Sequence, residues 1–128
     1  MEATQNKKIL VVDDLAVHRN QAKSILEKYG FLIDTAEDGI DALYKLSKCS
    51  YDVIITDIEM PNMNGFELLS KLKKTLEYIH IPVVVLSSRD KDKDIRRAKK
   101  LKADYYITKP ITNDEFLNAL SVVGLINT

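Results

Sequence analysis

Five short hydrophobic stretches recur along the chain, separated by segments in which hydrophobic residues return once per helical turn. The stretches are rich in β-branched residues and are mostly hydrophobic at successive positions, which is typical of strands buried on both faces of a parallel sheet. This pattern predicts strands over residues 8–12, 31–36, 51–56, 81–86 and 105–108.

The segments between and after the strands predict five helices, because their hydrophobic residues lie three or four positions apart. A helix over about 90–101 is the fourth of these. Asn64 and Glu67 are spaced as a capping box at the start of the third. The positions expected to face the core are Ala22, Ile25, Leu26 and Tyr29; Ile40, Leu43 and Leu46; Phe66, Leu69, Leu72 and Leu76; Ile95, Ala98 and Leu101; and Phe116, Ala119, Leu120 and Val123.

The alternation of strands and helices predicts the architecture. Parallel strands need crossover connections, and those crossovers are right-handed, so helices cover both faces of one sheet. We therefore expect an α/β fold with three layers, a doubly wound parallel five-stranded sheet. A length of 128 residues suits one domain, predicted over 1–128 with a core at about 7–123.

Composition narrows the possible partners. Lysine and arginine total 19 and aspartate and glutamate total 19, so net charge does not indicate a nucleic-acid partner. No hydrophobic stretch is long enough to cross a membrane. The single cysteine, Cys49, excludes an internal disulfide and is expected to be partly buried at a helix end. A cytoplasmic location fits these features.

Reactive side chains follow four of the predicted strands. Asp13 and Asp14 come after the first, Asp57 after the third, Ser87 after the fourth and Lys109 after the fifth. The carboxyl ends of parallel strands meet at one edge of a sheet, where ligands bind. We therefore expect three carboxylates, one hydroxyl and one ammonium group to share a single cleft.

This set of groups indicates metal-assisted phosphoryl transfer. Three neighbouring carboxylates repel one another and call for a cation. Oxygen ligands suit Mg²⁺, which keeps coordination positions open for water and phosphate. A carboxylate can accept a phosphoryl group as an acyl phosphate, and cations on the phosphoryl oxygens assist the transfer.

With these residues in place, the chain resembles the receiver domain of bacterial two-component response regulators. The resemblance runs from about residue 7 to residue 123 and implies the flavodoxin-like strand order 2-1-3-4-5. It rests on an ordered set of segments, Val11-Val12-Asp13-Asp14, Ile55-Thr56-Asp57-Ile58-Glu59-Met60-Pro61, Asn64-Gly65, Val85-Leu86-Ser87 and Tyr106-Ile107-Thr108-Lys109-Pro110.

The resemblance implies how the metal is held. Asp57 is similar in position to the phosphoacceptor of the family. Asp14 and Asp57 would bind Mg²⁺ directly, together with the backbone carbonyl of Glu59. Asp13 would act through a water molecule.

The resemblance also implies a switch. Ser87 and Lys109 would contact the phosphoryl group on Asp57, and Tyr106 would turn inward as Ser87 shifts. The Lys109–Pro110 bond is often cis in such families. A histidine kinase or phosphotransfer protein would donate the phosphoryl group, and an output protein or domain would bind the face formed by helix four, strand five and helix five. The protein would be a signalling switch, a monomer or weak dimer, that catalyses only its own phosphorylation and dephosphorylation.

Two departures from the family pattern stand out. Lys102 occupies a position where the family usually has glycine, and a left-handed backbone there would cost about 1 kcal/mol. Glu59 and Arg89 carry opposite charges on either side of the site. We expect them to pair above it and to slow hydrolysis of the phosphoryl group.

Two surface features remain open at this point. The fourth helix is rich in lysine and arginine, which indicates either a solvated face or a docking face for an acidic partner. Direct nucleic-acid binding is not expected, since no recognition-helix motif is present. His18 and His80 are expected on the surface, without partners for metal or nucleophilic chemistry.

Other functions on a similar sheet compete with this interpretation. A phosphohydrolase with an aspartyl intermediate usually has a D-x-D spacing after strand one, whereas Asp13 and Asp14 are adjacent. A flavin-binding module would need a phosphate loop there, which two aspartates would repel. The receiver could also be a module from a hybrid histidine kinase or a multidomain regulator.

Overall fold

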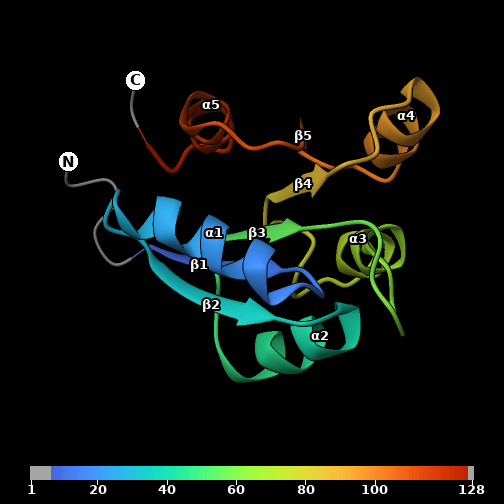
Figure 1. The fold of residues 1–128 in the computed structure, drawn as a ribbon. Helices are drawn as coiled ribbons and strands as arrows, with labels where there is room; N and C mark the ends of the chain where they lie inside the picture. Colours follow the sequence, from blue (N-terminus) through green and yellow to red (C-terminus); the bar gives the residue numbers. More distant parts are fainter. Residues whose placement is uncertain (1–6, 127–128) are drawn as a thin grey trace.

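The computed structural model describes residues 7–126, and residues 1–6 and 127–128 of the predicted domain lie outside this part of the chain. Strands and helices alternate along it (Figure 1). In order they are β1 (Lys8–Val12), α1 (Ala16–Glu27), β2 (Leu32–Ala36), α2 (Gly39–Lys48), β3 (Val53–Thr56), α3 (Gly65–Lys73), β4 (Val83–Ser87), α4 (Asp92–Lys100), β5 (Tyr105–Thr108) and α5 (Asn113–Val122).

All neighbouring strands of the sheet are parallel, in the order β2-β1-β3-β4-β5, which confirms the expected order. Strand order reverses beside β1, because the chain moves from β1 outward to β2 and then crosses to β3 on the other side. Val12 is aligned with Thr56, and Ser87 is aligned with Thr108. The residues that follow these strands therefore reach the same edge of the sheet.

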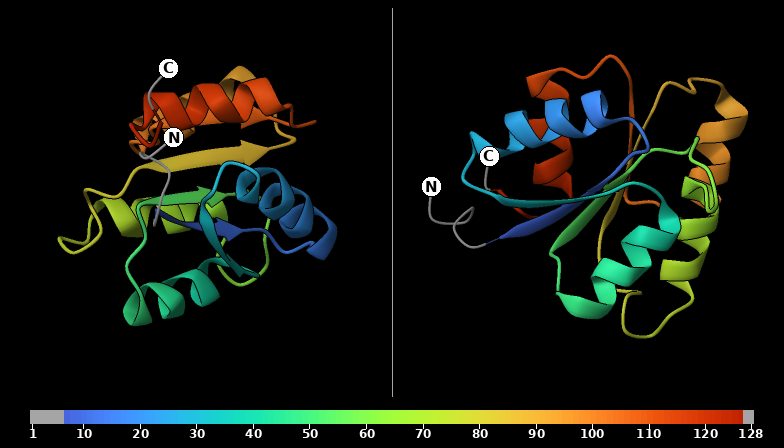
Figure 2. Two further views of the ribbon diagram at one scale, coloured as in Figure 1. Left: turned by 90° about the vertical axis from the view of Figure 1, so that its left-hand side faces the viewer. Right: turned by 60° about the horizontal axis from the view of Figure 1, so that its bottom comes forward.

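Two hydrophobic clusters cover the two faces of the sheet. Figure 2 shows the helices that lie over these faces from two sides. Successive residues of a strand point to opposite faces. Leu10 and Val12 belong to the cluster beneath α2, α3 and α4, whereas Ile9 and Val11 belong to the cluster beneath α1 and α5. This double burial explains why the strands are hydrophobic at successive positions, and it confirms the three-layer α/β fold.

The predicted capping box is present at the start of α3. The Asn64 side chain accepts a hydrogen bond from the Glu67 amide at 2.9 Å, and the Glu67 carboxylate accepts one from the Asn64 amide at 3.0 Å. These bonds satisfy two donors that a helix start leaves unpaired. They fix the point at which the loop after β3 becomes a helix.

The end of α3 differs from the prediction. Leu76 was expected on the core face, but the helix ends at Lys73 and the Leu76 side chain is 88% exposed. The Thr75 hydroxyl donates to the Lys71 carbonyl at 2.7 Å, and the amides of Tyr78 and Ile79 bond back to the Thr75 carbonyl. These turns satisfy the helix end and direct Leu76 away from the core.

Three smaller expectations were also wrong. The Ile40 side chain is 53% exposed rather than buried, because α2 turns Gly39, Ala42 and Leu46 toward the core instead. Cys49 is exposed rather than partly buried, since it caps the outer end of the same helix. The α4 helix begins at Asp92 and not at residue 90.

Lys102, after α4, has a left-handed backbone with a φ angle of 76°, so the loop keeps this geometry although the residue is not glycine. Its amide bonds to the Lys99 carbonyl and the next amide, of Ala103, bonds to the Ala98 carbonyl, both at 3.0 Å. The turn therefore closes the helix without the glycine that this geometry favours. Within residues 7–126, the structure has no helix with the length and hydrophobicity of a membrane span.

Candidate functional site

Asp57 directly follows β3 at the carboxyl edge of the sheet. Its amide donates to the Val12 carbonyl at 2.9 Å, which continues the pairing of β1 with β3 by one more residue. Its side chain is buried, and its Oδ1 atom accepts a hydrogen bond from the Ile58 amide at 2.7 Å. Backbone pairing therefore fixes the position of the carboxylate before any other side chain contributes.

Gly65 allows α3 to begin directly against Asp57. A Cβ atom at position 65 would lie 2.1 Å from the Asp57 carbonyl oxygen, which is far inside van der Waals contact. The Gly65 amide instead donates to the Ile58 carbonyl at 2.8 Å. The loop after β3 can close only because this residue has no side chain.

Lys109 reaches the same edge from the end of β5. Its amide donates to the Ser87 carbonyl at 2.8 Å, and the Lys109–Pro110 bond is cis, as the resemblance implied. Its Nζ atom lies 3.1 Å from Asp13 Oδ2 and 3.5 Å from Asp57 Oδ2. One ammonium group thus connects two carboxylates that are 44 residues apart in the sequence.

Ser87 is the buried last residue of β4. Its Oγ atom accepts a hydrogen bond from the Arg89 amide at 3.1 Å. The hydroxyl of Tyr106, in the adjacent strand, donates to the Arg89 carbonyl at 2.6 Å. Ser87 and Tyr106 are therefore hydrogen-bonded to the amide and the carbonyl of Arg89, respectively, in the loop before α4.

Burial dominates the electrostatics of Asp57. Loss of hydration raises the pKa of its carboxyl group above the ordinary value of 3.8. The Lys109 ammonium and the Ile58 amide lower this pKa, and the neighbouring Asp13 carboxylate raises it again. The site thus holds a carboxylate whose negative charge is incompletely compensated by the protein.

His18 was expected on the surface without partners, and this prediction was wrong. Its side chain is one-third exposed, and its Nδ1 atom lies 2.9 Å from Lys109 Nζ and 3.3 Å from Asp13 Oδ2. Ligand atoms of Asp13, His18 and Asp57 lie within 4.8 Å of one another. The first turn of α1 brings the imidazole over the edge of the sheet. His80 is exposed, as expected.

Asp14 occupies a different environment from Asp13. Its side chain is exposed, and it does not belong to the cluster of ligand atoms among the described residues. Asp13 is buried, with its Oδ1 atom accepting from the Leu15 amide at 3.0 Å and its carbonyl accepting from Arg19 at 2.8 Å. The structure therefore brings Asp13, Asp57 and Lys109 together and leaves Asp14 at the rim.

The expected pairing of Glu59 with Arg89 is confirmed. Arg89 Nε lies 2.8 Å from Glu59 Oε1, and Arg89 Nη1 lies 3.4 Å from Asp94 Oδ1. The first pair is exposed, whereas Asp94 is buried at the start of α4. Arg89 therefore connects the loop after β3 to α4.

The donor set of the site fits a small divalent cation. Asp13 and Asp57 offer buried carboxylate oxygens, and the two negative charges face a single ammonium group. Hard cations such as Mg²⁺ prefer oxygen ligands and use one or two carboxylates. Asp14 directly follows Asp13 in the sequence, and its carboxylate is exposed at the rim of the site.

Every residue of the site that lies at or directly after the end of a strand was predicted, because parallel strands end at one edge of the sheet. His18 was not predicted, because it lies in a helix. The available signal was spacing, since His18 lies five residues after Asp13 and therefore in the first turn of the following helix.

Comparison with known proteins agrees with this geometry. The family model for the response regulator receiver domain matches residues 9–121. Chemotaxis protein CheY-3 of Vibrio cholerae is 38% identical over 115 residues, which cover 88% of each chain.

Solved structures give the same result. The chemotaxis response regulator CheY4 of Vibrio cholerae matches with a TM-score of 0.85 and 31% identity, covering 93% of this chain and 99% of that one. Response regulator protein TrrA of Thermotoga maritima, in complex with Mg²⁺-BeF, matches with a TM-score of 0.81 and 32% identity, covering 91% and 98%. This chain therefore belongs to the response regulator receiver domain family, as a chemotaxis-regulator-like member of two-component signalling.

Proposed function

We propose that Asp57 accepts a phosphoryl group from the phosphohistidine of a histidine kinase or a phosphotransfer protein. The observation that carries this proposal is the Lys109 ammonium group, which lies within 3.5 Å of both Asp13 and Asp57 at the edge where strand order reverses. An unprotonated carboxylate beside a fixed cation is a suitable acceptor for a phosphoryl group. Receiver domains are signalling switches rather than classical enzymes.

The transfer exchanges one bond to phosphorus for another. An oxygen of Asp57 attacks the phosphorus atom, and a P–O bond forms while the N–P bond of the donor breaks. The electron pair of the N–P bond goes to the imidazole nitrogen, which is protonated from solvent. The Ile58 amide on Asp57 Oδ1 leaves Oδ2 as the attacking atom, and Oδ2 is the oxygen that faces Lys109.

Asp13, Asp14, Asp57 and the Glu59 carbonyl would hold Mg²⁺ in this proposal. When bound, Mg²⁺ supplies positive charge for the oxygens of the transferring group. Lys109, which follows β5 at the same edge of the sheet, supplies the second positive charge. The Mg²⁺-BeF complex of TrrA, a protein of the same fold, supports this assignment.

Ser87 and Tyr106 would transmit the change to the surface formed by α4, β5 and α5. A Ser87 hydroxyl that turns to a phosphoryl oxygen gives up its hydrogen bond from the Arg89 amide. The Tyr106 hydroxyl bonds to the carbonyl of the same residue, so movement of Arg89 frees the Tyr106 ring. An output protein or domain would bind the α4–β5–α5 surface in its changed form.

The proposal includes a single domain over residues 1–128, a cytoplasmic location and a monomer or weak dimer. It includes catalysis of the protein's own phosphorylation and dephosphorylation, with no other substrate. Direct binding of nucleic acid is not part of the proposal, because net charge is zero and no recognition-helix motif is present.

Incubation with acetyl phosphate tests the proposal. Intact-mass spectrometry should show the addition of one phosphoryl group in the presence of Mg²⁺ and none with excess chelator. Lys109→Ala should reduce the rate of addition by at least about tenfold, because it removes a cation from the transferring oxygens. The exposed Lys28→Ala is the matched control and should react like the wild type. Equal rates in both variants would contradict the role of Lys109.

A further inference from the structure

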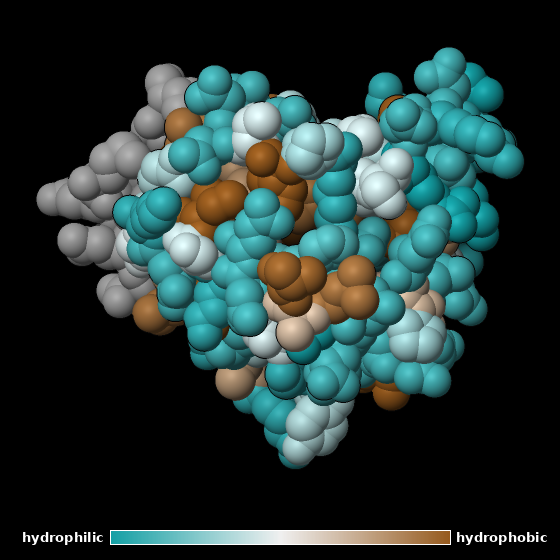
Figure 3. All heavy atoms as spheres, viewed as in Figure 1, coloured by the Kyte–Doolittle hydropathy of each residue, from teal (hydrophilic) through white to brown (hydrophobic). Residues whose placement is uncertain are grey.

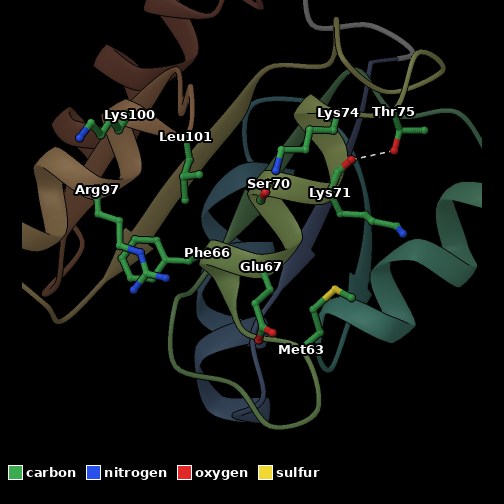
Figure 4. A pocket seen from close by; sticks show the side chains of 10 residues that line it. All are labelled: Met63, Phe66, Glu67, Ser70, Lys71, Lys74, Thr75, Arg97, Lys100 and Leu101. Atoms are coloured by element: carbon green, nitrogen blue, oxygen red, sulfur yellow. Dashed lines mark hydrogen bonds between the residues drawn. The ribbon is translucent and has the colours of Figure 1, made fainter.

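A groove separates α3 from α4, on the face of the sheet opposite to α1 and α5 (Figure 4). Its volume is about 760 Å³, which is within the range of ligand-binding sites. None of the residues assigned above to phosphoryl transfer lines it. The groove is therefore a surface that the proposed chemistry does not use.

The floor of the groove is hydrophobic. Phe66 is buried at the start of α3, and Met63 and Leu101 are partly buried on either side. The Arg97 side chain extends from α4 across the Phe66 ring, with its guanidinium carbon 4.2 Å from the ring centroid. Leu101 points from the end of α4 toward α3 in Figure 4. A hydrophobic side chain of a partner could make contact between these residues.

The rim of the groove is positively charged. It carries the exposed cations Lys71, Lys74, Arg97 and Lys100 and one acid, Glu67. None of these four cations forms an ion pair with a carboxylate of residues 7–126. By contrast, Lys73 on the same helix lies 3.2 Å from the Asp104 carboxylate.

The positive charge continues around α4. A second hollow, of about 620 Å³, is lined among the described residues by Lys93, Arg96, Arg97, Lys99 and Lys100. The one buried acid of this helix, Asp94, already bonds to Arg89. The surface over α4 is predominantly hydrophilic at the upper right of Figure 3. The whole chain has no net charge, so the positive charge around α4 is a local feature of this surface.

We propose that the α3–α4 groove binds an acidic peptide segment that carries an aliphatic side chain as an anchor. Carboxylates of the peptide would pair with the four unpaired cations, and the anchor would lie over Met63 and Leu101. Complementary charge of this kind guides association and selects the partner. Nucleic acid fits the groove less well, because Arg97 already covers the Phe66 ring on which a base would stack.

This site goes beyond the proposed function. It lies on the α3 side of α4, whereas the proposed output surface extends from α4 to β5 and α5. Binding needs no phosphoryl group on Asp57, so a failure of phosphorylation would leave it unaffected.

Fluorescence anisotropy can test the site with a labelled peptide of about twelve residues, rich in Glu and Asp, with two leucines one helical turn apart. At physiological ionic strength, we expect saturable binding with a Kd of about 100 µM or tighter. The Lys71→Glu, Lys100→Glu double variant should weaken binding at least about tenfold, because both rim cations become repulsive. A peptide with serine in place of leucine should also bind at least about tenfold more weakly.

A matched control distinguishes binding in the groove from general electrostatic attraction between the peptide and the protein. Lys28→Glu, Lys48→Glu makes the same change in net charge at exposed positions just after α1 and at the end of α2, and its Kd should stay within about twofold of the wild type. Circular dichroism should show the same fold for both double variants, and a milder Lys71→Gln, Lys100→Gln variant should weaken binding in the same direction. Amide resonances of Ser70 and Leu101 should shift when peptide is added.

Several results would overturn the proposal. These are no saturable binding to the wild type, equal weakening in both Glu double variants, no effect of removing the leucines, or amide shifts confined to other surfaces. Tighter binding of a single-stranded oligonucleotide of equal charge would show that the groove serves nucleic acid instead.

Discussion

The carboxylate of Asp57 is buried, and the neighbouring Lys109 ammonium and Ile58 amide compensate its negative charge only in part. Burial is the largest influence on its pKa, ahead of the opposing effect of Lys109. A residue selected for stability alone would not carry a charge here, because hydration of the carboxylate is lost on folding. The same loss of hydration leaves the carboxylate available to a cation and a phosphoryl group.

Asp57→Asn should therefore raise the free energy of unfolding at pH 7. Folding raises the pKa of Asp57, so between the unfolded and folded values the native state binds more protons and stability falls as pH rises. Below the ordinary pKa of 3.8 the group is protonated in both states, and the advantage of Asn should disappear. Urea unfolding of both proteins between neutral and acidic pH measures this difference.

The exposed Asp90→Asn variant is the control for this measurement and should show no comparable gain at pH 7. Lower stability of Asp57→Asn than of the wild type at pH 7 would show that the ion pair with Lys109 outweighs the cost of burial.

Arg89 should influence how long a phosphoryl group survives on Asp57. Its ion pair with Glu59, at 2.8 Å, joins the loop after β3 to the loop before α4, and we expect this pair to restrict the access of water to Asp57. Glu59→Ala and Arg89→Ala should each accelerate dephosphorylation about two- to fivefold, the effect expected from losing an exposed ion pair. The decay of the phosphorylated mass after removal of donor measures the rate, and unchanged rates in both variants would refute the idea.

At the scale of elements, the sequence predicted which segments are strands and helices more closely than it predicted where they begin and end. Strands β3 and β4 begin two residues after the predicted starts at 51 and 81, because Tyr51 and Ile81 are buried before the strand pairing begins. Helix α3 instead ended before its last hydrophobic residue, Leu76, because Thr75 bonds to the preceding turn. Side-chain to backbone hydrogen bonds of this kind do not appear in a hydrophobic pattern.

The turn after α4 carries measurable strain. Lys102 has a φ angle of 76°, which a residue with a Cβ atom adopts at a cost that glycine avoids. Lys102→Gly should raise the free energy of unfolding by about 1 kcal/mol. Thermal or urea unfolding would measure the gain, with Lys100→Gly as a control that should destabilise α4 by about 1 kcal/mol. A loss of stability in Lys102→Gly would contradict this account of the turn.

At the scale of the whole molecule, the convergence of the site followed from topology. The parallel sheet brings Asp13, Asp57 and Lys109 together because each directly follows a strand, and Ser87, the last residue of β4, reaches the same edge. His18 could not be found in this way, since a helix positions it. The environments of Asp13 and Asp14 depend on the path of the chain after β1, which adjacent identical residues do not reveal.

Phosphorylation should change the structure around α4 more than the opposite side of the molecule. Ser87 and Tyr106 both bond to Arg89, so a ligand that attracts the Ser87 hydroxyl should displace this loop. Addition of Mg²⁺ and beryllium fluoride should shift the amide resonances of Arg89 and Tyr106, while those of α2 near Tyr44 change little. The Asp57→Asn variant should show no such shifts, and equal shifts across the whole protein would contradict a directed switch.

The position of the acyl phosphate tests the central claim most directly. Borohydride reduces an aspartyl phosphate to homoserine, and tandem mass spectrometry of a digest then identifies the modified residue. After treatment with acetyl phosphate and Mg²⁺, we predict homoserine at position 57 alone. Homoserine at position 13 or 14, or no homoserine in a protein that has gained the phosphoryl mass, would contradict the assignment of Asp57 as the acceptor.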